Sequence, residues 1–264
     1  MTMLRATRRA LLGLCLFLFS LGVAFAADIQ VITSGAFAAA LKELAPAFEK
    51  NSPHKVVISH GSSMGAAPDA IPARLARGER FDILIMAGPA LDDFIRQGKA
   101  MPGSRVDLAA STIGAVVRAG APRPDISTLE GFKNALLNAK SIAYSASASG
   151  TYLSGEVFAK IGVADQIKDK AKRIFSERVA SVVARGDAEL GFQQVSELLP
   201  VAGVDFIGEI PPEVQKVEYF SAGLINDTQN LQAARELIGF LASAAAAPVI
   251  KKTGMNPVVP KLPR

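Results

Sequence analysis

The chain has 264 residues, half of them apolar, which is enough for one large domain or for two lobes of ordinary size. It carries 29 Lys and Arg against 24 Asp and Glu, without a basic run or interleaved aromatic residues, so we expect no binding of nucleic acid. Its two histidines are too few for an ordinary histidine metal site, and we predict neither a metal nor another cofactor.

The first 26 residues have the layout of a cleaved secretory signal. Three arginines and no acid occur in the first ten residues, an apolar run fills 11–22, and Ala24-Phe25-Ala26 places small residues two apart. The run is shorter than the ~20 apolar residues that a membrane-spanning helix needs, so a permanent anchor fits less well. We therefore expect a periplasmic protein that starts near Ala27 and is not inserted in the membrane after cleavage.

Cleavage would also remove the single cysteine, Cys15. It follows Leu14, where a lipoprotein cleavage site needs a small residue, so we expect no lipid anchor. The mature chain of 238 residues would then contain no disulfide and no thiolate ligand or nucleophile. Because three arginines leave with the signal, 26 basic residues remain against 24 acidic ones, a net charge of +2. We expect this mature chain to be a monomer.

Strand-like and helix-like segments alternate in the first part of the mature chain. Short apolar segments predict strands over 29–33, 55–59 and 81–86, and the segments after them predict helices over 38–50, 70–77 and 90–97. In the first of these helices, one face carries Leu41, Leu44, Ala45 and Phe48. This order predicts a mostly parallel sheet with helices on both faces, and hence an α/β protein.

The order changes after residue 107. We predict helices over 128–138, 152–161, 178–184, 194–198 and 229–242, strands over 141–144 and 189–193, and long extended stretches over 107–117 and 214–224. Two extended stretches that pass between lobes would make the first lobe discontinuous and place a ligand in a hinged cleft. The predicted division is a signal peptide over 1–26, a first lobe over 27–107 and 222–264, and a second lobe over 108–221.

Three loops of small polar residues each follow a predicted strand and enter a predicted helix. They lie at 33–36, 61–65 and 145–152. Hydroxyl groups and the free N–H groups of a helix start favour an anion, although each loop alone is more typical of a helix cap and turn. Together they predict a small anionic ligand, with these candidate contacts: Ser34, Gly35, Ser62, Ser63, Met64, Ser147, Ser149, Gly150, Thr151 and Tyr152.

Four further side chains are candidates. His60 precedes the second loop and is either a general base or a strand-end histidine satisfied by solvent. Gln193 and Gln194 follow a buried strand, and their amides could bind a carboxyl group. Arg178 begins a helix and is either a bidentate carboxylate clamp or an exposed charge at the helix entry. No catalytic triad, phosphate-binding loop or dinucleotide motif is present.

The order of these motifs resembles the periplasmic molybdate-binding proteins. The resemblance is carried by the Ser34-Gly35 loop, the helical Leu41–Glu49 segment, the Gly-Ser-Ser loop, Arg77–Ile85 and the Ala184–Ala188 turn. It implies a two-lobe type II solute-binding fold with two hinge strands, which usually serves an ABC importer and its permease.

The ligand pattern of that family is only partly kept. Ala36 stands where the family has a serine, Gln194 stands where it has a tyrosine, and 64–69 is an insertion. We therefore expect an organic di- or tricarboxylate to bind better than molybdate.

Three short segments, 61–65, 144–150 and 192–194, also resemble a branch of this family that includes periplasmic aconitate isomerase. The first expectation is a binding protein of an importer. The alternative is an isomerase on the same fold that moves a proton in a tricarboxylate, with His60 or a cleft carboxylate as the base.

Overall fold

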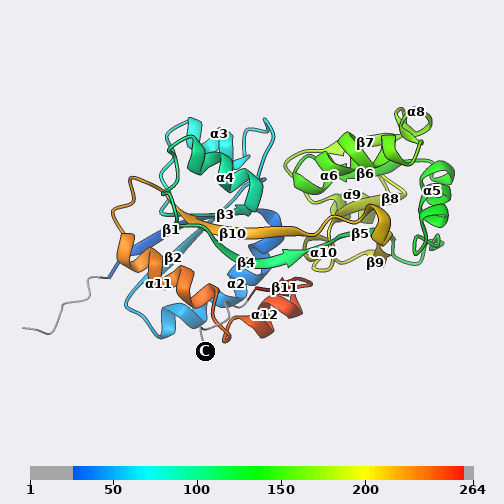
Figure 1. Ribbon diagram of the computed structural model, residues 1–264. Helices are drawn as coiled ribbons and strands as arrows, with labels where there is room; N and C mark the ends of the chain where they lie inside the picture. The colour runs from blue at the N-terminus through cyan, green and yellow to red at the C-terminus, as the bar shows by residue number, and fades with distance from the viewer. Residues whose placement is uncertain (1–25, 259–264) are drawn as a thin grey trace, which may run out of the picture.

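The computed structural model describes residues 26–258; the predicted signal up to residue 25 and the end of the chain, 259–264, lie outside these residues. Figure 1 shows two lobes side by side, each built on its own sheet. The predicted two-lobe α/β fold is thereby confirmed. No helix among residues 26–258 is long and apolar enough to cross a membrane.

The first lobe contains a six-stranded sheet. In sheet order its strands are β11 (Asn256–Pro257), β4 (Val106–Ser111), β10 (Glu218–Leu224), β3 (Ile83–Ala87), β1 (Asp28–Thr33) and β2 (Lys55–His60). Strand β1 runs parallel to β2 and β3, as the alternating pattern predicts, whereas β10 runs antiparallel to β3 and β4. The sheet is therefore mixed, because its last strands come from a chain that returns from the other lobe.

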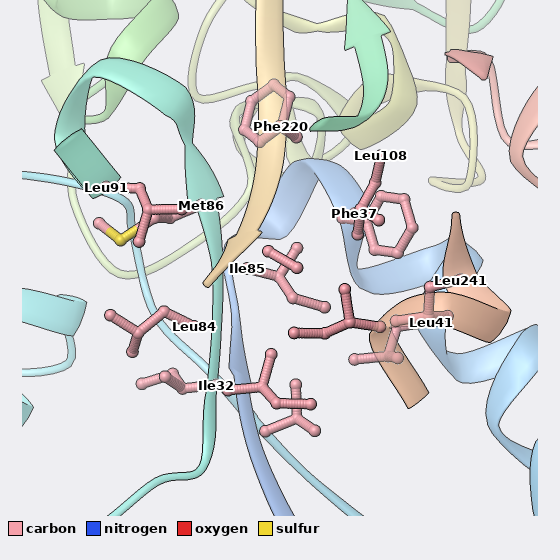
Figure 2. Close-up of a cluster of buried hydrophobic side chains, with 14 of the residues drawn as sticks. Ile32, Phe37, Leu41, Leu84, Ile85, Met86, Leu91, Leu108, Phe220 and Leu241 are labelled. Atoms are coloured by element: carbon pink, nitrogen blue, oxygen red, sulfur yellow. The ribbon is translucent and has the colours of Figure 1, made fainter. Parts of the chain in front are cut away.

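Helices cover both faces of this sheet (Figure 1). They are α2 (Gly35–Lys50), α3 (Ile71–Ala76), α4 (Gly88–Arg96), α11 (Leu231–Leu241) and α12 (Ala247–Lys252). Helix α2 buries the face predicted for it, including Leu41 and Phe48. Figure 2 shows Phe37 and Leu41 of this helix packed with Ile85 of β3 and Leu241 of α11. This packing fixes the start of α2 against the sheet.

The second lobe contains a five-stranded sheet with its own helices. In sheet order its strands are β7 (Ala171–Ile174), β6 (Ile142–Ser145), β8 (Leu190–Gln194), β5 (Ile113–Arg118) and β9 (Val204–Glu209). Its helices are α5 (Leu129–Asn138), α6 (Ala148–Tyr152), a π-helical turn (Leu153–Val157), α7 (Phe158–Lys160), α8 (Ala164–Ile167), α9 (Val179–Arg185) and α10 (Val195–Leu198). Strands β6, β7 and β8 are parallel, so their carboxyl ends share one edge.

The chain passes between the sheets twice. It crosses at Thr112 between β4 and β5, and it returns after β9 through a 3-10 turn (Pro212–Val214) into β10. Each predicted extended stretch therefore belongs to a crossing, and the predicted lobe limits at 107–108 and 221–222 fall inside β4 and β10. These crossings bring the carboxyl ends of the parallel strands of both sheets to face each other (Figure 1).

Candidate functional site

A pocket of about 320 Å³ lies between the lobes, where the carboxyl ends of the parallel strands meet. The first lobe contributes the start of α2 and the loop after β2, and the second lobe contributes the segments after β6, β7 and β8. Most predicted contacts line this pocket: Ser34, Gly35, His60, Ser62, Met64, Ser147, Ser149, Arg178, Gln193 and Gln194. Among residues 26–258, no three His, Cys, Asp or Glu side chains are placed to hold a metal ion.

The other predicted contacts lie beside the pocket. The Ser63 hydroxyl is buried and accepts a hydrogen bond from the Ala87 N–H at 3.0 Å, which ties the second loop to β3. Gly150 packs against the Ser145 carbonyl, where a side chain would not fit. Thr151 accepts a hydrogen bond from Arg173, and Tyr152 donates one to the Val214 carbonyl. Contact of these four residues with a ligand stays a prediction.

The start of α2 offers an unused donor to the pocket. Ser34 is the N-cap residue of this 16-residue helix, yet its buried Oγ has no hydrogen-bond partner among the described residues. Ser34 and Gly35 at the start of α2 line the pocket, so the positive end of the helix dipole faces the cleft, and the first turn of α2 contains no acidic residue. A buried hydroxyl without a partner is costly, and an anion bound here would supply that partner.

Glu197 on α10 is the group that the sequence analysis missed. Its carboxyl is buried, accepts a hydrogen bond from Gln193 Nε2 at 2.9 Å, and packs against Gly35. A side chain at position 35 would collide with this carboxyl, so the glycine is what lets Glu197 approach α2. Burial raises the pKa of Glu197 to about 7, while the nearby Arg178 charge and the hydrogen bond from Gln193 act in the opposite direction.

Two basic side chains complete the chemistry of the pocket. Arg178 is the N-cap residue of α9 and lies near both Glu197 and His60. Burial and the charges of Arg178, Arg74 and Lys42 lower the pKa of His60, which favours its neutral imidazole. The site therefore combines a fixed cation and a neutral imidazole with a carboxyl group that titrates near neutrality.

A hydrogen bond between the lobes closes one side of the pocket. Ser176, before α9, donates from its Oγ to Asp69 Oδ1 at 2.7 Å, and Asp69 belongs to the loop before α3 in the first lobe. Ser176 holds a left-handed backbone conformation with φ of 58°, which is unusual for a serine. Glu177 beside it pairs with Arg185, which offsets its negative charge at the pocket. The two lobes are therefore in contact across the cleft.

Comparison with known proteins agrees with this architecture. Residues 29–256 match the family model of bacterial extracellular solute-binding proteins. The chain is 45% identical over 230 residues to an aconitate isomerase from Pseudomonas sp., an alignment that covers 87% of this chain and 88% of that one. It is 27% identical over 251 residues to the molybdate-binding protein ModA of Azotobacter vinelandii, covering 87% and 90% of the two chains.

Structural comparison gives the same relationship. The periplasmic molybdate-binding protein of Azotobacter vinelandii matches with a TM-score of 0.71 and 25% identity, over 89% of this chain and 100% of that one. The sulfate-binding protein SubI of Mycobacterium tuberculosis shares the fold, with a TM-score of 0.66 and 17% identity over 88% of both chains. The chain therefore belongs to the family of bacterial extracellular solute-binding proteins, in the part of that family that resembles the molybdate-binding proteins and includes aconitate isomerase.

Proposed function

We propose that this protein is an isomerase that interconverts cis- and trans-aconitate by moving a proton, with Glu197 as the acid-base group. The observation that carries the proposal is the buried carboxyl of Glu197 at the pocket, with a pKa of about 7. The 45% identity with a Pseudomonas aconitate isomerase over most of both chains supports it. A pocket that only held a multiply charged anion would gain nothing from a carboxyl group that ionises near neutral pH.

The reaction requires only one proton to change place. Aconitate has a methylene group next to its double bond, and removal of a methylene proton leaves an anion spread over three carbons and the attached carboxylates. Return of a proton to the other end of this system shifts the double bond and allows either geometry. A single carboxyl group can take and return the proton, and it does so best when its pKa lies near the working pH.

The remaining side chains of the pocket suit the carboxylates of the substrate. Arg178 can bind one carboxylate through two parallel hydrogen bonds, and the start of α2 with the Ser34 hydroxyl can bind another. Further polar side chains that line the pocket include Ser62, Ser147, Ser149 and Gln194. We assign the base role to Glu197 in place of His60, because Glu197 is buried at the pocket whereas His60 lies at its exposed rim. Partial desolvation and the neighbouring charges of Arg178, Arg74 and Lys42 also lower the pKa of His60, which makes it the weaker base.

The pH-rate profile of the purified protein tests this assignment. We expect isomerisation of cis-aconitate to depend on a group that titrates near pH 7, and Glu197→Gln to lose roughly 10²–10⁴-fold in kcat. Glu209→Gln, at the exposed end of β9, is the matched control and keeps the parent rate. A Glu197→Gln variant with the parent rate would contradict the assignment.

The second candidate is a periplasmic carrier that delivers a small organic carboxylate to the permease of an ABC importer. The two crossings between the lobes support it, because a cleft between lobes joined by two crossing segments can close by hinging. A carrier would bind a carboxylate tightly, contract on binding in small-angle scattering and leave the ligand unchanged. In both candidates the mature protein is a periplasmic monomer that starts near Ala27, and N-terminal sequencing of exported protein tests that start.

A further inference from the structure

The side chain of Gln193 lies between the proposed acid-base group and the start of α9. We propose that Gln193 is a positioning residue that fixes the orientation of the Glu197 carboxyl and favours its ionised form. The catalytic meaning of this inference rests on the proposed isomerase function. The geometry behind it does not, so the two can be tested apart.

Two hydrogen bonds lock the amide of Gln193 in one orientation. Its Oε1 accepts from the backbone N–H of Val179 at 2.9 Å, and its Nε2 donates to Glu197 Oε1 at 2.9 Å. A backbone N–H can only donate, so the amide oxygen must face Val179 and the amide nitrogen must face Glu197. Both side chains are buried, with exposed fractions of 4% for Gln193 and 8% for Glu197. The amide therefore presents a donor, and never an acceptor, to the carboxyl.

A donor fixed in this way favours the carboxylate over the carboxylic acid. Burial acts in the opposite direction, and the charge of Arg178 adds to the effect of the amide. Helix α2 faces Glu197 with Gly35, which has no side chain. The other titratable groups that line the pocket are His60, Asp69 and Glu177. The Gln193 hydrogen bond and the charge of Arg178 are thus the two side-chain interactions that favour the ionised form of Glu197.

The same hydrogen bonds connect the acid to the end of α9 that faces the ligand. Val179 is the first residue of α9, and Arg178 before it is the cation proposed to bind a substrate carboxylate. Because Gln193 is held by the backbone at that point, one amide links the Glu197 carboxyl to the backbone at the start of α9. The next residue, Gln194, also lines the pocket but has an Oε1 without a partner among residues 26–258. Replacement of Gln194 therefore provides a matched control for the loss of an amide from the pocket.

The test measures the pKa of Glu197 directly and the rate separately. The carboxyl signal of Glu197 is followed by carbon-13 NMR in protein labelled at glutamate, and it is assigned by its loss in Glu197→Gln. In Gln193→Met, which keeps the length of the side chain but removes the donor, we expect this pKa to rise by about one pH unit or more. With aconitate as substrate, kcat at pH 7 falls about fivefold or more and KM stays within twofold, since fewer molecules carry the ionised carboxyl.

A second variant guards against loss of the fold. Gln193→Glu keeps an acceptor for the Val179 N–H, but it places a second carboxyl group against Glu197. As the pH falls, this pair of carboxyl groups therefore binds its first proton at a higher pH than Glu197 does in the parent. Gln194→Met leaves the pKa of Glu197 unchanged, whatever it does to ligand affinity. An unchanged or lower pKa in folded Gln193→Met overturns the inference. If no variant and no parent protein isomerises aconitate, the proposed function fails while the NMR titration still decides the role of Gln193.

Discussion

Replacement of Glu197 by Gln has a pH-dependent effect on stability that follows from its burial. The carboxyl has a pKa of about 7 in the folded protein against 4.5 when free, so the folded state binds its proton more tightly than the unfolded state does. The free energy of unfolding of the parent therefore falls as pH rises from about 4.5 through about 7, and this contribution is constant above that range. Over this pH range the free energy of unfolding falls by about 3 kcal/mol in total, at ~1.4 kcal/mol per pKa unit.

Glutamine has nearly the same shape and does not ionise, so the variant lacks this contribution. At pH 8 we expect Glu197→Gln to unfold about 6–12 °C above the parent, at ~2–4 °C per kcal/mol for a chain of this length, and at pH 4.5 to unfold at nearly the same temperature. Thermal melts of both proteins from pH 4.5 to 8 measure this, with Glu209→Gln following the parent. Parallel melting curves for parent and Glu197→Gln at every pH would refute the claim that the carboxyl ionises at a cost in the folded state.

Three further changes test the binding geometry. Ser34→Ala removes a buried hydroxyl without a partner in the described residues, so the melting temperature of the free protein stays the same or rises. The affinity for aconitate, measured by calorimetry, falls by roughly 1.5–3 kcal/mol, because the hydroxyl would donate to a charged carboxylate, and equal affinity would remove Ser34 from the site. Arg178→Gln weakens binding by roughly 1.5–3 kcal/mol and raises the pKa of Glu197, and an unaltered dissociation constant would make Arg178 a surface charge. Gly35→Ala places a methyl group against the Glu197 carboxyl and lowers kcat at least tenfold. The control Gly239→Ala, in open space on α11, keeps the parent kcat, and equal rates in the two variants would contradict the close packing of Gly35 on Glu197.

Much of the fold follows from local patterns in the sequence. The apolar face of α2 and the alternation of strands and helices predict the parallel strands of the first sheet. Because parallel strands end at one edge, the Ser and Gly loops after them could be expected to meet, and most of the predicted contacts do line one pocket. Helix α9 ends at Gly186 with a φ of 86°, as its Arg-Gly sequence predicts.

Other features depend on contacts between distant residues. Strand β7 has only four residues with two exposed charged side chains, and β9 contains Asp205 and Gly208, so neither has a clear strand pattern. The break between β4 and β5 at Thr112 is set by which sheet each half joins, and this is decided by pairing with β10 and β8.

Glu197 illustrates the limit for the site. It lies in the short helical segment Val195–Leu198 after β8, where an acid can face solvent or be buried. Its burial comes from contact with Gly35, which is far away in the chain and belongs to the other lobe. The place of this acid directly after a buried strand was the available signal, but only the packing of α10 on α2 shows that its side chain is buried.

Under the proposed function, the cleft converts aconitate and does not merely hold it. The most direct measurement is proton NMR of two samples, one started from cis-aconitate and one from trans-aconitate, each in large molar excess over the protein. A catalyst changes rates without changing the equilibrium, so we predict that both samples reach the same ratio of isomers, and that they do so far more slowly with Glu197→Gln. Two samples that each keep their starting isomer, with a protein that binds it tightly, would contradict the account and identify a carrier.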